Sequence, residues 1–151
     1  MGFGDSPPPA ALSRYTGFLL SWVAARSRTR FEAALEDLDL RLQHFALMSV
    51  VAAEPGLTQQ DLVGKTHIDP STMVQTLDAL AESGNVERRP HHSDRRKHTV
   101  HLTAQGETTL EEAREAAKSA GRETLGRLDA AERKELQRML RKIAGLDEGK
   151  A

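Results

Sequence analysis

Basic side chains gather in one short stretch of this 151-residue chain, and their chemistry suits binding to phosphate. Between residues 85 and 101, five Lys or Arg side chains stand against two carboxylates, which gives this stretch a charge of +3. The whole chain carries −1, so the remaining residues sum to −4. Binding to a nucleic-acid backbone needs a local basic footprint rather than a basic protein. The candidate phosphate contacts are Arg88, Arg89, Arg95, Arg96 and Lys97.

A second set of polar side chains, upstream of the basic stretch, could read base edges. Met73, Leu77 and Leu80 mark the inner face of a predicted helix. Beside Asp78 and Ala79, the outer face and its edge carry four uncharged polar residues, Ser71, Thr72, Gln75 and Thr76. A Gln amide can pair with adenine through two hydrogen bonds, and hydroxyl groups can bind phosphates or meet a thymine methyl group. The alternative interpretation of each of them is an ordinary solvated helix residue.

Two short helices and a hairpin must position these side chains. Thr58 is the predicted N-cap of the first helix, with Asp61 as its capping partner three residues later. Asp69-Pro70 is a strong start for the second helix, which we expect to end at Gly84. The strand-like segments 86–88 and 99–102 flank turn residues at 90–94. This order predicts a helix-turn-helix followed by a hairpin.

Several segments occur in one order and at one spacing: Leu57-Thr58-Gln59, 80–84, 86–89, Asp94-Arg95-Arg96 and Leu102-Thr103-x-x-Gly106. Together they resemble the winged helix-turn-helix of the MarR (multiple-antibiotic-resistance regulator) family, and the resemblance extends over residues 12–146. It implies a mainly α fold with a small β-hairpin wing, and long N- and C-terminal dimerisation helices. It also implies a homodimeric repressor that binds pseudo-palindromic double-stranded DNA and is released by a small phenolic or carboxylate effector.

The family layout suggests a division of the chain. Residues 1–10 are expected to be a flexible tail, and residues 11–151 a single domain. Residues 11–40 and 104–147 would be the dimerisation helices, and residues 41–103 the DNA-binding lobe. The hydrophobic content of 38% is low for a compact monomer, which favours helices that complete their burial against a second subunit. The alternative is that these helices pack only within one chain.

The resemblance also assigns roles to individual residues. It places Arg96 in the minor groove, where A/T-rich segments concentrate negative potential. Asp94 is expected to brace the Arg96 guanidinium through a bidentate pair. Many members of the family carry arginine where this chain has Gln75 and Ala79, so we expect the wing to supply most of the phosphate affinity.

Effector binding is predicted on the first long helix. Trp22 and Arg26 lie one helical turn apart and could offer an aromatic wall and a partner for an anion. His44 is expected to approach the same region. The alternative is that Trp22 belongs to the core and that Arg26 makes a surface ion pair.

Other classes of function find less support in the sequence. The chain has no cysteine and no apolar run of roughly 20 residues, so we expect a cytoplasmic protein without disulfides or membrane spans. No motif for a nucleophile and its base, or for a phosphate-binding loop, predicts an enzyme, and no cofactor is expected. Four histidines cluster in the hairpin, but a mobile tip is a poor scaffold for zinc, so we predict no metal site. The alternative function is a winged-helix interaction module that binds an acidic protein.

Overall fold

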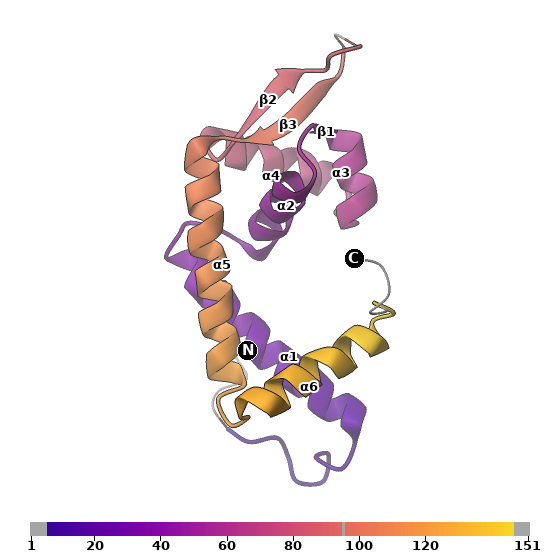
Figure 1. The fold of residues 1–151 in the computed structure, drawn as a ribbon, viewed down its shortest axis with the longest axis vertical. Coiled ribbons are helices and arrows are strands. Elements are labelled where there is room, and N and C mark those ends of the chain that lie inside the picture. Colours follow the sequence, from indigo (N-terminus) through magenta and orange to yellow (C-terminus); the bar gives the residue numbers. More distant parts are fainter. Residues whose placement is uncertain (1–5, 95, 147–151) are drawn as a thin grey trace.

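In the computed structural model, which describes residues 6–94 and 96–146, the chain forms six helices and three strands (Figure 1). The elements are α1 Thr16–Glu36, α2 Leu42–Ala53, β1 Leu57–Thr58, α3 Gln59–Thr66, α4 Pro70–Glu82, β2 Val86–Pro90, β3 His98–Leu102, α5 Ala104–Thr124 and α6 Ala130–Ile143. The predicted helix-turn-helix corresponds to α3 and α4, and the predicted hairpin to β2 and β3. Within the described ranges, no helix has the length and apolar character that crossing a bilayer requires.

Capping interactions start the two helices of the motif where the sequence predicted. Thr58 Oγ1 accepts the Asp61 N–H at 3.3 Å, and Asp61 Oδ2 accepts the Thr58 N–H at 2.9 Å, which completes a capping box before α3. Asp69 Oδ1 accepts the Thr72 N–H at 3.0 Å, and Pro70 occupies the first position of α4. These bonds satisfy amide groups that the first turn of a helix leaves unpaired.

The hairpin belongs to a small antiparallel sheet whose strand order is β1-β3-β2. Its register places Val86 opposite Leu102. On the other edge of β3, the short strand β1 places Leu57 opposite Val100. The sequence interpretation assigned Leu57 to the helix start and missed this strand, because two residues are too few to show an alternating pattern.

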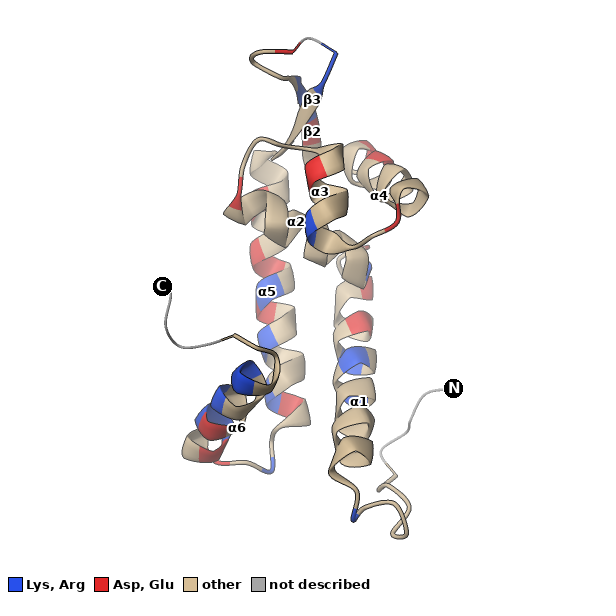
Figure 2. Cartoon of the chain, turned by 90° about the vertical axis from the view of Figure 1, so that its right-hand side faces the viewer, with Lys and Arg blue, Asp and Glu red and all other residues tan. Residues whose placement is uncertain are grey.

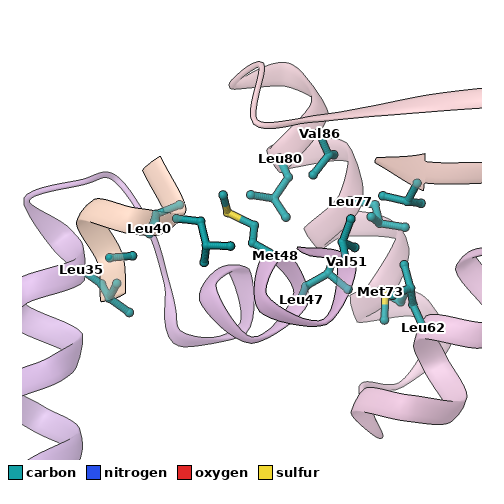
Figure 3. Packing of buried hydrophobic residues seen from close by; sticks show 13 residues of the cluster. Leu35, Leu40, Leu47, Met48, Val51, Leu62, Met73, Leu77, Leu80 and Val86 are labelled. Carbon is teal, nitrogen blue, oxygen red and sulfur yellow. The ribbon is translucent and has the colours of Figure 1, made fainter. Parts of the chain in front are cut away.

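A continuous apolar core joins the lobe to the end of α1 (Figure 3). Leu47, Met48 and Val51 of α2 lie at its centre and are almost completely buried. The other elements of the lobe and the start of α5 contribute Leu62, Met73, Leu77, Leu80, Val86, Val100, Leu110 and Ala113. The burial of Met73, Leu77 and Leu80 confirms the predicted inner face of α4. Leu35 and Leu40 extend the core to the α1–α2 connection, which is therefore anchored against the lobe.

The two long helices, α1 and α5, pack side by side below the lobe (Figure 2). Helix α1 begins at Thr16 rather than at residue 11, because Tyr15 has an extended backbone (φ −97°, ψ 112°) that ends the preceding turn. The helix continues without a break through residues 26–30. Helix α5 ends at Thr124.

Helix α6 leaves its apolar face uncovered. Asp129 and Glu132 form a capping box at its start. No residue of α6 is buried, and the apolar stripe that continues just beyond the helix is exposed at Met139, Leu140, Ile143 and Leu146. In the single chain this stripe therefore lacks the packing partner that its spacing calls for.

Candidate nucleic-acid interface

The N-terminal turn of α4 presents two hydroxyl residues that Asp69 holds in place. The Ser71 hydroxyl donates to Asp69 Oδ1 at 2.6 Å, and the same oxygen accepts the Thr72 N–H at 3.0 Å. The hydrogen bonds from Ser71 and Thr72 hold the pKa of the Asp69 carboxyl well below its usual range. Because the Ser71 proton is engaged with Asp69, the Ser71 oxygen is left as an acceptor for amino groups such as those on base edges.

Farther along α4, the neighbouring residues Gln75 and Thr76 differ in their exposure to solvent. Gln75 is exposed on the outer face, where its amide can reach a base edge. Thr76, expected at the edge of that face, is instead 1% exposed. Its hydroxyl donates to the Thr72 carbonyl at 2.7 Å and accepts from Gln43 Nε2 at 3.2 Å. Thr76 therefore lies within the packing between α2 and α4, and the structure contradicts its assignment to the contact surface.

The exposed side of α4 carries carboxylates and no basic residue (Figure 2). Asp78 and Glu82 are both exposed, and Arg88 of β2 donates to Asp78 Oδ1 at 2.6 Å. The pair links the strand of the wing to the helix and neutralises one charge on each. Nothing in the local sequence predicted this contact, because the two residues lie ten positions apart on different elements.

Arg89, the next residue of the strand, is also engaged within the chain. It forms an ion pair with Glu87, two residues earlier on β2. Its side chain lines an open pocket together with His101 of β3 and Arg114 of α5. Since Arg88 and Arg89 both have acidic partners, the unpaired basic charge of the wing lies nearer its tip.

The tip of the wing is a tight turn closed by Asp94. The Lys97 N–H donates to the Asp94 carbonyl at 3.0 Å, and the Arg96 N–H donates to Asp94 Oδ1 at 3.0 Å. Asp94 thus braces the turn through the Arg96 backbone, whereas we expected a pair with the Arg96 guanidinium. The side chain of Arg96 is exposed. Arg95 lies outside the described residues.

Lys97 and the wing histidines make further contacts around the turn. Lys97 lies near enough to α3 to contribute, after the hydrogen bond from Thr58, to a lowered pKa of Asp61. The rings of His91 and His92 stack at 4.5 Å between centroids. His91 Nδ1 lies 3.2 Å from the Ser93 hydroxyl. These contacts involve residues 91–93, which lead into the turn from β2, whereas Arg96 follows Asp94.

The structure does not bring the three candidate effector residues together. His44 lines a pocket with Glu36 and Asp39, just beyond the end of α1. At 1.5 Å per residue, Arg26 and Trp22 lie about 15 and 21 Å before Glu36 along the helix. His44 Nδ1 accepts the Arg41 N–H at 3.1 Å. Burial, followed by the Arg41 charge, lowers the pKa of the His44 imidazole, so the imidazole is neutral near pH 7.

Comparisons with known proteins agree with this architecture. The model of the MarR family matches residues 40–98. The HTH-type transcriptional repressor Rv2887 of Mycobacterium tuberculosis is 32% identical over 143 residues, which cover 95% of this chain and 98% of that protein. The crystal structure of Rv2887 in complex with DNA matches with a TM-score of 0.76 at 31% identity, over 85% of this chain and 97% of that one. The crystal structure of Rv2887 in complex with salicylic acid matches with a TM-score of 0.71 at 31% identity, over 92% of this chain and 98% of that one.

Proposed function

The chain belongs to the MarR family, and we propose that it is a homodimeric transcriptional repressor that binds pseudo-palindromic double-stranded DNA. The proposal rests on one observation above all: the polar outer face of α4 and an exposed Arg96 lie on one lobe, joined by the Arg88–Asp78 pair. The related repressor Rv2887 has been crystallised with DNA. The names of related proteins, which are transcriptional repressors, support repression rather than activation.

Each part of the lobe has a distinct proposed role. Ser71, Thr72 and Gln75 enter the major groove, since N-terminal residues of a recognition helix reach base edges. Arg96 enters the adjacent minor groove, and Lys97 and Arg95 contact phosphates. Because α4 itself carries only acidic charges, affinity for the phosphate backbone comes mainly from the wing.

The remaining helices serve assembly in this proposal. Residues 11–40 and 104–147 form the dimerisation region, and residues 41–103 the DNA-binding lobe. The uncovered apolar stripe at the end of the chain, Met139, Leu140, Ile143 and Leu146, supports this division. Covering that stripe with a second copy would remove apolar surface from water. We further propose that the protein is not an enzyme and that it acts in the cytoplasm.

Release by an effector is proposed on the same basis. Rv2887 has been crystallised with salicylic acid, a phenolic carboxylate. In this chain, a pocket of about 530 Å³ lies between the second half of α1, the start of α2 and the turn that connects α3 to α4. Arg28 and Arg41 line it; Arg28 already pairs with Glu32 at 2.8 Å, so Arg41 is the guanidinium proposed for a carboxylate. Trp22 and Arg26, earlier on α1, remain candidate effector residues.

The experiment that tests this function is selection from a random duplex library with wild type and Arg96→Ala at two salt concentrations. We expect an inverted repeat whose half-sites lie about 10 base pairs apart. Arg96→Ala should bind it roughly tenfold more weakly. The slope of the logarithm of the binding constant against the logarithm of the salt concentration should be smaller by about one in magnitude. Lys134→Ala, on the far side of α6, is the control that should change neither. Failure to enrich any site would contradict the proposal.

One observation favours the alternative of a module that binds an acidic protein. Helix α4 has no basic residue, so the phosphate contacts common in recognition helices are missing from it. The selection would favour this alternative over the repressor proposal if the protein bound duplex DNA only weakly, without sequence preference and with strong sensitivity to salt.

A further inference from the structure

An open pocket of about 660 Å³ lies between the α1–α2 connection and one flank of α4. Its apolar wall consists of Leu40, Ala79 and Leu80, and its polar wall includes Gln43 and Gln75. A pocket of 300–1,000 Å³ that combines apolar walls with a few polar groups is typical of small-molecule sites. Of the residues named above as effector contacts, Arg41 and His44 line this pocket.

The charges around this pocket favour a cation. Three carboxylates line it, those of Glu36, Asp39 and Glu82, against the single guanidinium of Arg41. Two other pockets of the described residues are balanced, with two carboxylates against two guanidinium groups in each. A positively charged ligand is therefore attracted to this pocket more than to either of the others.

Helix ends add to this preference independently of the side chains. Helix α1 ends at Glu36 and α4 at Glu82, so the pocket meets two helix C-termini. Neither helix carries a basic residue in its last turn. The partial negative charge of a C-terminus favours cations. The N-terminus of α2 also faces the pocket, and its partial positive charge offsets one of these C-termini. The N–H of its N-cap residue, Arg41, is however already bonded to His44 Nδ1.

The pocket borders the bond that connects α2 to the recognition helix. Gln43 Nε2 donates to Thr76 Oγ1 at 3.2 Å, and both residues line the pocket. Gln75 and Ala79, on the same flank of α4, are exposed. A ligand placed here would contact the side of α4 that lies next to its proposed base-reading face.

We infer that this pocket is a second ligand site, which takes a small organic cation with a flat or compact apolar body. Its occupant contacts Gln43, Gln75 and the carboxylates of Asp39 and Glu82. The site adjoins the one proposed for a phenolic carboxylate, with which it shares Glu36, Leu40, Arg41 and Gln43, and differs from it in charge. Binding of the cation does not depend on the proposed function. The further consequence, weaker binding to the operator, does rest on it.

Benzamidinium and benzoate form a matched pair of probes, since they share a ring and differ in the sign of their charge. Each is titrated into ¹⁵N-labelled protein at constant ionic strength and followed by NMR. Benzamidinium should shift the signals of residues 39–44 and 75–83, including the Gln43 side-chain amide, and benzoate should not. Asp39→Asn and Glu82→Gln should each weaken benzamidinium binding about fivefold. Glu111→Gln, which lines a different pocket, should leave it unchanged.

The outcomes separate the parts of the inference. Equal or stronger shifts of these residues with benzoate would overturn the choice of a cation. Absence of shifts with both probes would overturn the site itself. The operator consequence is tested with the selected duplex and a sodium chloride control of equal ionic strength. Benzamidinium should weaken wild-type binding more than it weakens Glu82→Gln. If benzamidinium binds as expected but wild type selects no duplex, the site stands and the repressor proposal fails.

Discussion

Gly106 of α5 lies against the backbone of Asn85, and a Cβ at position 106 would lie 2.9 Å from the Asn85 carbonyl carbon. The same junction is held by the Thr103 N–H, which donates to the Asn85 carbonyl at 3.1 Å. The Thr103 hydroxyl donates to the Gly84 carbonyl at 2.6 Å. The end of the recognition helix is thereby docked on the start of the longest C-terminal helix, and the contact has no room for a side chain at position 106.

Gly106→Ala should lower the free energy of unfolding by about 1–3 kcal/mol, because backbone rather than a flexible side chain would have to move. Urea denaturation followed by circular dichroism measures the change. Gly121→Ala is the matched control in the same helix, since a Cβ there meets nothing within 4 Å. That control should stabilise the helix by about 1 kcal/mol. Similar values for the two variants would show that the close contact has no energetic weight.

Asp78→Asn should strengthen sequence-independent duplex binding and steepen the salt slope by about one, because it frees the Arg88 guanidinium for phosphate. Fluorescence anisotropy at several salt concentrations gives the slope. Glu112→Gln, a change of an exposed carboxyl group on α5, controls for net charge. Weaker binding by Asp78→Asn would contradict this prediction and would mean that the pair chiefly holds the wing in place.

Ionised Asp69 should contribute stability that disappears in acid. Its folded-state pKa is lowered by the hydrogen bonds from Ser71 and Thr72, so its contribution is fully present above the unfolded pKa of about 3.9. The contribution is then lost as the pH falls below that value towards the folded-state pKa. The stability difference between wild type and Asp69→Asn should therefore shrink below pH 4, measured by urea denaturation. A difference that stayed constant down to pH 2 would exclude this role.

Charges placed on the apolar stripe of α6 should dissociate the proposed dimer. Leu140→Glu and Ile143→Glu should each raise the dimer dissociation constant roughly tenfold to a hundredfold, because a buried aliphatic side chain contributes about 1.5–3 kcal/mol. Sedimentation velocity over a concentration series measures the constant. Lys134→Glu, on the opposite face of α6, should leave the dimer intact. A wild-type monomer at all concentrations would refute the assembly.

Part of the candidate site followed from the sequence because its determinants are local. The caps formed by Thr58 with Asp61 and by Asp69 with Thr72 act within three residues. The inner face of α4 follows from helical spacing, and the burial of Met73, Leu77 and Leu80 confirms it. The family could be identified for the same reason, since its motif is a fixed order of such local signals.

Other parts depend on elements that are distant in the sequence. The sequence alone located the two helices of the motif and the hairpin, but it began the first long helix at residue 11 and missed β1. Only the tertiary structure decided that Thr76 turns inward to Gln43 and that Asp78 binds Arg88. It also placed His44, at the start of α2 beyond the end of α1, away from Trp22, which lies in the first half of α1. A position at the edge of an amphipathic face has no periodicity that settles its burial, so the neighbouring helix decides which way its side chain points.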